Sequence, residues 1–454
     1  MKQTFTMKEK VKQFTVILIP ILITQLGMIS MNFFDTMMSS RYSADHLAGV
    51  AIGSSLWVPV FTGLSGILLS MTPIVAHLVG AGKKEQVPFS VMQGIYASSA
   101  LALVILILGS FALDPVLQLM DLEENVRAIA KAYVIALGFG IIPVFIFTVF
   151  RCFIDALGMT RTSMVVTLIA LPLNVIFNYA LIFGKWGFPE LGGVGAGYAT
   201  ALTYWLTALI AAWIIHRQRP FSEYKIFHSF PAISLSKWKE IFMIGVPIGL
   251  SIFFETSIFS AVTLFMSEYS TNVIAAHQVA INFSSMLYMI PLSISLSLTI
   301  VVGFEVGAKR MRDAKLYSWL GVSMAVCISL LCTIMLFLFR QGIAGIYTDN
   351  QEVLQLTAQF LIFAAIFQLS DAVQAPVQGA LRGYKDVNMT FIMTMISYWI
   401  IGLPLGYYLA NYSSLEAFGY WIGLISGLTA GAVTMSFRLL YVQNKKYGSS
   451  LSSR

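Results

Sequence analysis

The sequence is poor in charged residues. Only 11% of its 454 residues are Asp, Glu, Lys or Arg, while 57% are hydrophobic. Soluble domains have about 25% charged residues, because charge is needed to cover a surface that faces water. The mean hydropathy of +0.79 agrees. The composition therefore excludes a soluble globular protein and predicts a polytopic membrane protein.

Cysteine is also scarce. Cys152, Cys327 and Cys332 form no CxxC pair, and all three lie in or beside apolar segments. We expect small packing side chains and no disulfide, thiol catalysis or zinc site. The sequence has no GxxxxGK[ST] phosphate-binding loop either. We therefore expect no cofactor, and any pumping would have to draw on an ion gradient.

Long apolar runs dominate the chain. A helix needs about 20 apolar residues to cross the membrane, and these runs are continuous rather than alternating, which favours helices over barrel strands. Residues 1–13 are polar and basic, and the run that follows is too long for a signal peptide. The prediction is an all-α fold with twelve spans, near 14–39, 47–79, 91–112, 126–150, 160–184, 194–215, 241–266, 273–302, 316–339, 353–377, 389–410 and 417–441.

The basic residues predict the orientation. With the N-terminus inside, only five of the 28 Lys and Arg fall outside, which leaves 23 in cytoplasmic loops; the five are Arg41, Arg127, Lys131, Lys185 and Arg340. Cytoplasmic loops carry an excess of Lys and Arg. We therefore expect a multi-pass protein of the plasma (bacterial inner) membrane with both termini in the cytoplasm. The net charge of +7 then reflects these loops and not a nucleic-acid partner.

The two halves of the chain repeat each other. Ile19-Pro20 aligns with Val246-Pro247, an offset of 227 residues, and Gly80-Ala81 aligns with Gly307-Ala308 at the same offset. Both halves start inside and contain six spans, so the repeat has parallel topology and predicts two pseudo-symmetric six-helix lobes. We predict an N-terminal lobe over 1–215, a basic cytoplasmic linker over 216–240, and a C-terminal lobe with a short polar tail over 241–454.

Three carboxylates lie inside apolar segments: Asp35, Glu255 and Asp371. A charged group in hydrocarbon costs about 2.5–3.5 kcal/mol even on lenient scales. No Lys or Arg is expected deep in a span to pair with them, so the carboxylates are predicted to bind a proton, Na⁺ or a cationic solute. They are not equivalent in the repeat, because Asp35 aligns with Val262 and Glu255 aligns with Met28. Two different cation sites are therefore expected.

Amide and hydroxyl side chains also lie inside apolar spans, and some of them are one helical turn apart. Asn174 and Asn178 are one turn apart, and Thr200 follows a glycine-rich entry to the next span. With Asp35 they could form a hard-cation or proton site in the first lobe. Gln278 and Asn282 form a polar stripe in the second lobe. Polar residues in membrane helices often simply bond a neighbour, for about 0.6 kcal/mol, and we expect that packing role for the intramembrane His277.

Several segments together resemble the multidrug and toxic compound extrusion (MATE) family, and within it the NorM-type bacterial branch. The resemblance covers nearly the whole chain. The segments that carry it are Pro73-Ile74-Val75-Ala76 with Gly80-Ala81-Gly82, Phe153-Ile154-Asp155-Ala156-Leu157-Gly158 with Thr160-Arg161, Pro172-Leu173-Asn174, Asn178-Tyr179, Leu191-Gly192-Gly193-Val194-Gly195, Ala275-Ala276-His277-Gln278 and Gly303-Phe304-Glu305-Val306-Gly307.

This resemblance implies export of organic cations by Na⁺ or H⁺ antiport, from a monomer surrounded by membrane lipids. Asp35 matches the first-helix acid of bacterial members, and Glu255 and Asp371 match the second-lobe acids of the NorM-type branch. Asn174, Asn178 and Thr200 match the polar partners of the first acid, and Gln278 and Asn282 match less closely. The alternative is a flippase for a lipid-linked precursor, which would favour a basic cavity rather than acids. The choice between Na⁺ and H⁺ stays open, because carboxylates with amides serve both.

Overall fold

The computed structural model describes residues 1–120, 122–347 and 350–452, and within these residues it is helical with no β-strand. Among these described residues, eleven helices are long and apolar enough to span a membrane. A twelfth span is a helix pair, Glu124–Gly138 and Ile141–Ala156, bent by 47°. The predicted all-α fold with twelve spans is therefore confirmed, and the fourth span is a broken one.

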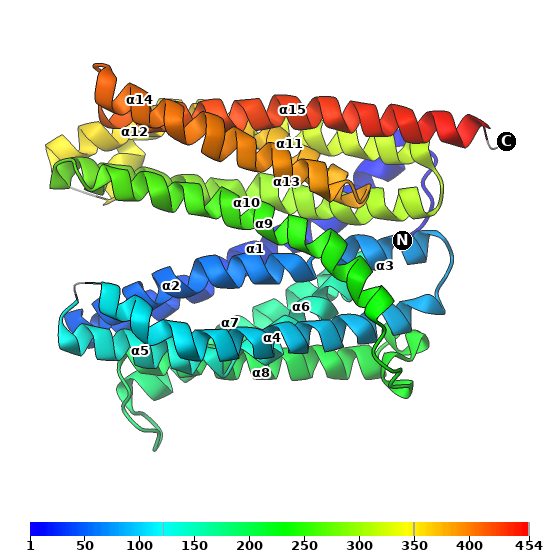
Figure 1. The fold of residues 1–454 in the computed structure, drawn as a ribbon, viewed down its shortest axis with the longest axis horizontal. Helices are drawn as coiled ribbons and strands as arrows, with labels where there is room; N and C mark the ends of the chain where they lie inside the picture. Colours follow the sequence, from blue (N-terminus) through cyan, green and yellow to red (C-terminus); the bar gives the residue numbers. More distant parts are fainter. Residues whose placement is uncertain (121, 348–349, 453–454) are drawn as a thin grey trace. The chain divides into compact units, whose positions relative to one another are not determined.

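The chain divides into two compact units (Figure 1). Unit 1 holds Met1 and Ile19–Gly249, and unit 2 holds Lys2–Leu18 and Leu250–Arg454. The helices wholly in unit 1 are α2 (Ala44–Leu68), α3 (Met71–Gly80), α4 (Gln86–Leu119), α5 (Glu124–Gly138), α6 (Ile141–Ala156), α7 (Thr160–Phe183) and α8 (Gly193–Arg217), with short 3₁₀ turns η1 (Phe221–Tyr224) and η2 (Ile226–His228).

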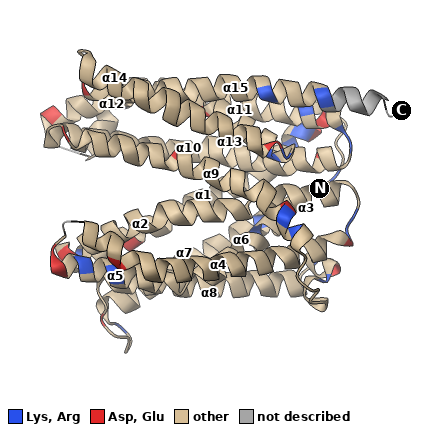
Figure 2. Cartoon of the chain, in the orientation of Figure 1, with Lys and Arg blue, Asp and Glu red and all other residues tan. Residues whose placement is uncertain are grey.

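Unit 2 contains the remaining helices. They are α10 (Thr271–Gly307), α11 (Met311–Tyr347), α12 (Gln351–Gly383), α13 (Val387–Met395), the π-helix η3 (Ile396–Gly402), α14 (Leu403–Tyr412) and α15 (Ala417–Ser452). Its apolar core includes Phe360, Trp421 and Leu428. Figure 2 shows Lys and Arg of unit 2 toward the end of the bundle that holds the described C-terminal part of α15, whereas Arg340 lies near the C-terminal end of α11.

Two helices contribute residues to both units. α1 (Met7–Tyr42) and α9 (Leu235–Met266) each contain an internal proline, Pro20 and Pro247, at aligned positions of the repeat. The division between the units falls within three residues of each proline. The units thus differ from the predicted lobes at two places: Lys2–Leu18 packs with unit 2, and the start of α9 packs with unit 1.

Small residues allow close helix packing around the polar positions in each unit. A methyl group at Gly195 of α8 would overlap the carbonyl oxygen of Leu181 in α7. In unit 2, a methyl group at Gly379 of α12 would overlap the carbonyl oxygen of Ser295 in α10. Membrane helices associate through such small-residue contacts. Both contacts fix helices that carry polar side chains.

Candidate functional site

Asp35 is the centre of a buried polar cluster in unit 1. Its side chain on α1 is 6% exposed. Asn178 Nδ2 on α7 donates to Asp35 Oδ1 at 2.5 Å, and Thr200 Oγ1 on α8 donates to Oδ2 at 2.9 Å. Each carboxylate oxygen is therefore held by a neutral donor from a different helix.

Asn174 completes this cluster. Its Nδ2 donates to Thr200 Oγ1 at 3.4 Å, and its Oδ1 accepts from Asn178 Nδ2 at 3.1 Å. The structure thus brings together all four residues predicted for the first lobe. Asn178 Oδ1 is buried and, among the described residues, has no hydrogen-bond partner. Buried polar atoms are nearly always bonded, so this oxygen is a candidate ligand for a cation.

Two tyrosines that lie near Asp35 were not identified from the sequence. The phenols of Tyr133 on α5 and Tyr204 on α8 lie near enough for electrostatic interaction with its carboxylate. Tyr204 is four residues after Thr200, so helical spacing could have found it. Tyr133 comes from a helix with no other predicted site residue, and the sequence gives no signal for it.

Unit 2 holds the other two acids. Glu255 lies on α9 and Asp371 on α12, close enough for their charges to interact. Gln378 Nε2, on α12, donates to Glu255 Oε1 at 2.7 Å. This bond fixes which face of α12 meets Glu255.

The surroundings of Asp371 are polar but incompletely bonded. Asp371 Oδ2 and Gln374 Oε1 are buried and, in the described part of the chain, lack a hydrogen-bond partner. Gln374 Nε2 donates to the Tyr398 hydroxyl at 3.1 Å. Tyr398 lies in the π-helix η3, a distortion that is frequent at functional sites. Sequence periodicity could not reveal it, because a π-helix breaks the 3.6-residue pattern.

Gln278 and Asn282 lie apart from these acids. Gln278 Nε2 donates to Asn282 Oδ1 at 3.4 Å, and both side chains are exposed. No described hydrogen bond joins either of them to Glu255 or Asp371. The structure therefore does not bring the predicted second-lobe stripe to the second-lobe acids.

A basic side chain near the end of α12 interacts electrostatically with Glu255, and the sequence did not indicate this partner. Arg382 is 5% exposed, and its charge interacts with that of Glu255. The predicted span ended at residue 377, but α12 continues as a helix to Gly383. Arg382 therefore belongs to the same helix as Asp371 and Gln378. This partner could not be found in the sequence because hydropathy located the end of the apolar run and not the end of the helix.

Both ring nitrogens of the intramembrane His277 have hydrogen-bond partners. His277 is 0% exposed, and Trp421 Nε1 donates to its Nδ1 at 3.1 Å. Its Nε2 lies 3.3 Å from Thr263 Oγ1. Because Nδ1 accepts a hydrogen bond, the ring's proton is on Nε2. This arrangement fits a packing residue.

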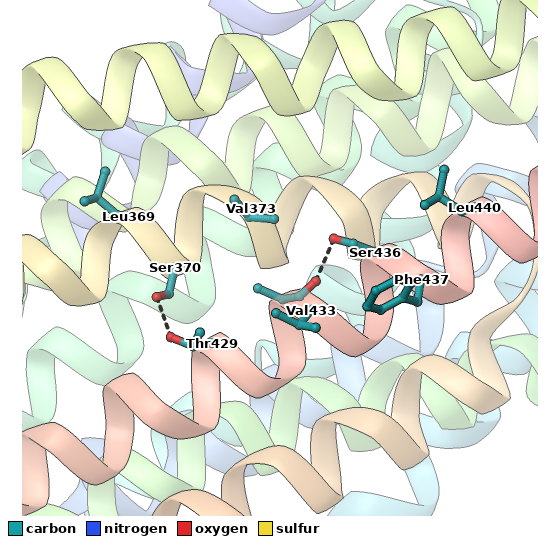
Figure 3. Close-up of a pocket in the computed structure, with 9 residues that line it drawn as sticks. Leu369, Ser370, Val373, Thr429, Val433, Ser436, Phe437 and Leu440 are labelled. Carbon is teal, nitrogen blue, oxygen red and sulfur yellow. Dashed lines mark hydrogen bonds between the residues drawn. The ribbon is translucent and has the colours of Figure 1, made fainter.

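A separate apolar groove of about 540 Å³ lies between α12 and α15 in unit 2 (Figure 3). Ser370 and Thr429 share a hydrogen bond of 2.8 Å across it. Leu369, Ser370 and Val373 line it from α12 and lie on a different face of that helix from the acid. None of the described residues that line the groove is acidic, so the groove is separate from the acid site.

A sodium ion would find suitable ligands at both sites. Na⁺ is a hard cation and prefers oxygen ligands, which carboxylates, amides and hydroxyls supply. The described residues contain no cluster of three His, Cys, Asp or Glu side chains. A metal site here would therefore combine one or two carboxylates with neutral oxygens, as around Asp35.

Comparisons with known proteins identify the class. Solved structures with the same fold include an outward-facing multidrug resistance MATE family transporter of the MOP superfamily, with TM-score 0.87 and 19% identity over 97% of this chain and 99% of that one. The Vibrio cholerae MATE transporter VcmN in its bent form matches with TM-score 0.86 and 18% identity, over 97% and 98%. The fold is thus that of MATE transporters.

Sequence matches give the family. The MatE family model matches twice, at residues 20–180 and 247–408, which reproduces the internal repeat. The "Probable multidrug resistance protein NorM" of Oceanobacillus iheyensis is 58% identical, covering 98% of this chain and 100% of its own length. The protein of the same name from Bacillus subtilis is 55% identical, covering 98% of each. The chain belongs to the MatE family.

Proposed function

We propose that this protein exports lipophilic organic cations from the cytoplasm in exchange for Na⁺ or H⁺. One observation carries the proposal: a carboxylate, Asp35, is buried among neutral hydrogen-bond donors from α7 and α8. A buried carboxylate without a bonded basic partner is costly, so it gains much from binding a cation. The names of the relatives, multidrug resistance proteins, support drugs as the exported solutes.

Competition for carboxylates would couple the two movements. A drug cation enters from the cytoplasm, and Na⁺ or H⁺ arriving from outside neutralises Asp35, or Glu255 with Asp371. Each bound cation removes the negative charge that attracts the other, so their affinities are reciprocally linked. The bound coupling ion lowers drug affinity, and the drug leaves outward.

The setting of this activity follows from the charge pattern. The basic loops support a plasma-membrane protein with both termini in the cytoplasm. We expect a monomer among membrane lipids, with no cofactor other than the coupling ion and no nucleic-acid partner.

Efflux from proteoliposomes tests the proposal. Ethidium is loaded inside, and a Na⁺ or a pH gradient is imposed separately across the membrane. We expect one or both gradients to accelerate ethidium release above that of protein-free vesicles. Release that neither gradient changes would contradict the proposal. Gradient-independent movement of a lipid-linked phosphate precursor would instead support the flippase alternative.

A further inference from the structure

Arg382 lies on the polar face of α12. Asp371, Gln374, Gln378 and Arg382 follow one another at spacings of three, four and four residues, which places them on one side of the helix. The 2.7 Å bond from Gln378 to Glu255 shows that this side faces α9. Arg382 is one turn beyond Gln378, and its charge reaches Glu255.

A buried arginine is a permanent charge. Its guanidinium does not lose its proton in proteins, and burying it is costly unless an acid compensates. Arg382 is 5% exposed, so it has been withdrawn from water almost completely. Glu255 is the acid that this charge reaches, and it is bonded to Gln378 one turn before Arg382.

We propose that Arg382 is a built-in cation of the unit 2 site. It neutralises Glu255 and leaves Asp371 as the carboxylate that receives a mobile cation. This inference rests on the proposed function, in which the unit 2 acids bind the coupling ion. Arg382 acts through Glu255 and is therefore a positioning residue.

The two acids are differently placed along the helix. Asp371 is eleven residues before Arg382, about 16 Å along the helix axis. Its Oδ2 and the neighbouring Gln374 Oε1 are the buried oxygens that, within the described residues, lack partners. Glu255 already receives Gln378 and faces Arg382. The buried oxygens without a described partner are thus at and beside Asp371, whereas the fixed positive charge of Arg382 acts on Glu255.

Unit 1 provides a contrasting arginine. Arg151 Nη1 on α6 lies 3.5 Å from the sulfur of Met28, and Met28 is the residue aligned with Glu255. An arginine on the fourth span therefore reaches the same aligned position in both units. Only in unit 2 does it meet a carboxylate there. Arg151→Gln is consequently a matched control for loss of a fixed charge.

A charge-exchange cycle tests the proposal. All variants are made in an Asp35→Asn background, in which only unit 2 would bind the coupling ion. The melting temperature of each purified protein is measured as the concentration of Na⁺ or of H⁺ is raised. Removing an opposite charge near a carboxylate changes the carboxylate's proton affinity by about tenfold or more. With R382Q, Glu255 becomes available, so we expect half-maximal stabilisation at a cation concentration about tenfold lower or less. R382K should resemble the parent, and R151Q should leave the midpoint unchanged.

The reciprocal variant gives the decisive comparison. E255Q leaves Arg382 uncompensated, so cations should be repelled from Asp371; for a charge about 16 Å away at an effective dielectric constant of about 20, the midpoint should rise roughly fivefold. The double variant E255Q/R382Q should return the midpoint toward that of the parent, which a merely structural role would not produce. A double variant no better than E255Q would overturn the inference. If neither cation stabilises the Asp35→Asn background protein, the unit 2 part of the proposed function is overturned as well. If a cation does stabilise that protein but the double variant fails to restore the midpoint, only the role of Arg382 is overturned.

Discussion

The acid sites of the two units are built from different chemistry. In unit 1 a single carboxylate, Asp35, is held by Asn178 and Thr200, which are neutral. In unit 2 two carboxylates, Glu255 and Asp371, share their site with a buried arginine. One site holds a single carboxylate among neutral donors, while the other holds two carboxylates and a guanidinium.

The repeat shows that the fold does not require these acids. Val262, which aligns with Asp35, is 2% exposed within the apolar core of unit 2 beside Ile258 and Met266. Met28, which aligns with Glu255, is a neutral thioether. The same backbone position accepts a carboxylate in one unit and an apolar side chain in the other. The acids are therefore better explained by function than by packing.

Asn178→Leu should produce the largest effect on the unit 1 site. It removes the donor to Asp35 and the bond to Asn174 with little change in volume. A hydrogen bond to a charged group contributes about 1.5–3 kcal/mol, so coupled ethidium efflux should fall roughly 30-fold or more. Efflux in proteoliposomes at matched protein levels measures this. If the variant exports ethidium as fast as the parent, Asn178 does not contribute to the coupling site.

Thr200→Val should lower coupled efflux about tenfold, because it deletes a single donor to the carboxylate. Thr203→Val is the matched control on the same helix. Thr203 is also buried, but within the described structure its hydroxyl donates only to the Ala199 carbonyl, at 2.8 Å. Equal losses in the two variants would show that the effect comes from α8 and not from Asp35.

Gln278→Leu separates the second-lobe stripe from the acid site. Gln278 bonds only Asn282 in the described structure, and at 3.4 Å. Such intramembrane bonds contribute about 0.6 kcal/mol, so coupled efflux should change by no more than about threefold. A loss as large as that of Asn178→Leu would restore the sequence-based assignment of Gln278 and Asn282 to the site.

Trp421→Phe should have the smallest effect on coupling and act on stability alone. It removes the hydrogen bond to His277 within the core of unit 2. The expected cost is about 1 kcal/mol of unfolding free energy, seen as a lower melting temperature in detergent. Coupled efflux at a temperature below melting should equal that of the parent. Loss of coupling without loss of stability would make His277 part of the transport chemistry.

Much of the fold could be predicted from the sequence, because each span is a long apolar run. The unit 1 site was also predictable, since Asp35, Asn174, Asn178 and Thr200 each lie on a polar face of an apolar helix, and the structure brings them together. Gln278 shows the limit of this reasoning. Helical spacing identifies a polar face, but it does not identify the helix that this face meets.

Arg382 shows a second limit. It lies at the end of its helix, where arginines usually reach toward water, so hydropathy places it outside the span. Its burial is a tertiary effect, and three residues before it α12 packs closely against α10 at Gly379. Tyr398 was missed for a related reason, because its position depends on the π-helix η3.

The central claim is that Asp35 is required to couple export to a cation. The most direct test is ethidium efflux by Asp35→Asn in proteoliposomes under a Na⁺ gradient and under a pH gradient, with Glu255 and Asp371 intact. The account predicts a folded, inserted protein whose efflux neither gradient accelerates. Efflux equal to that of the parent under both gradients would contradict it.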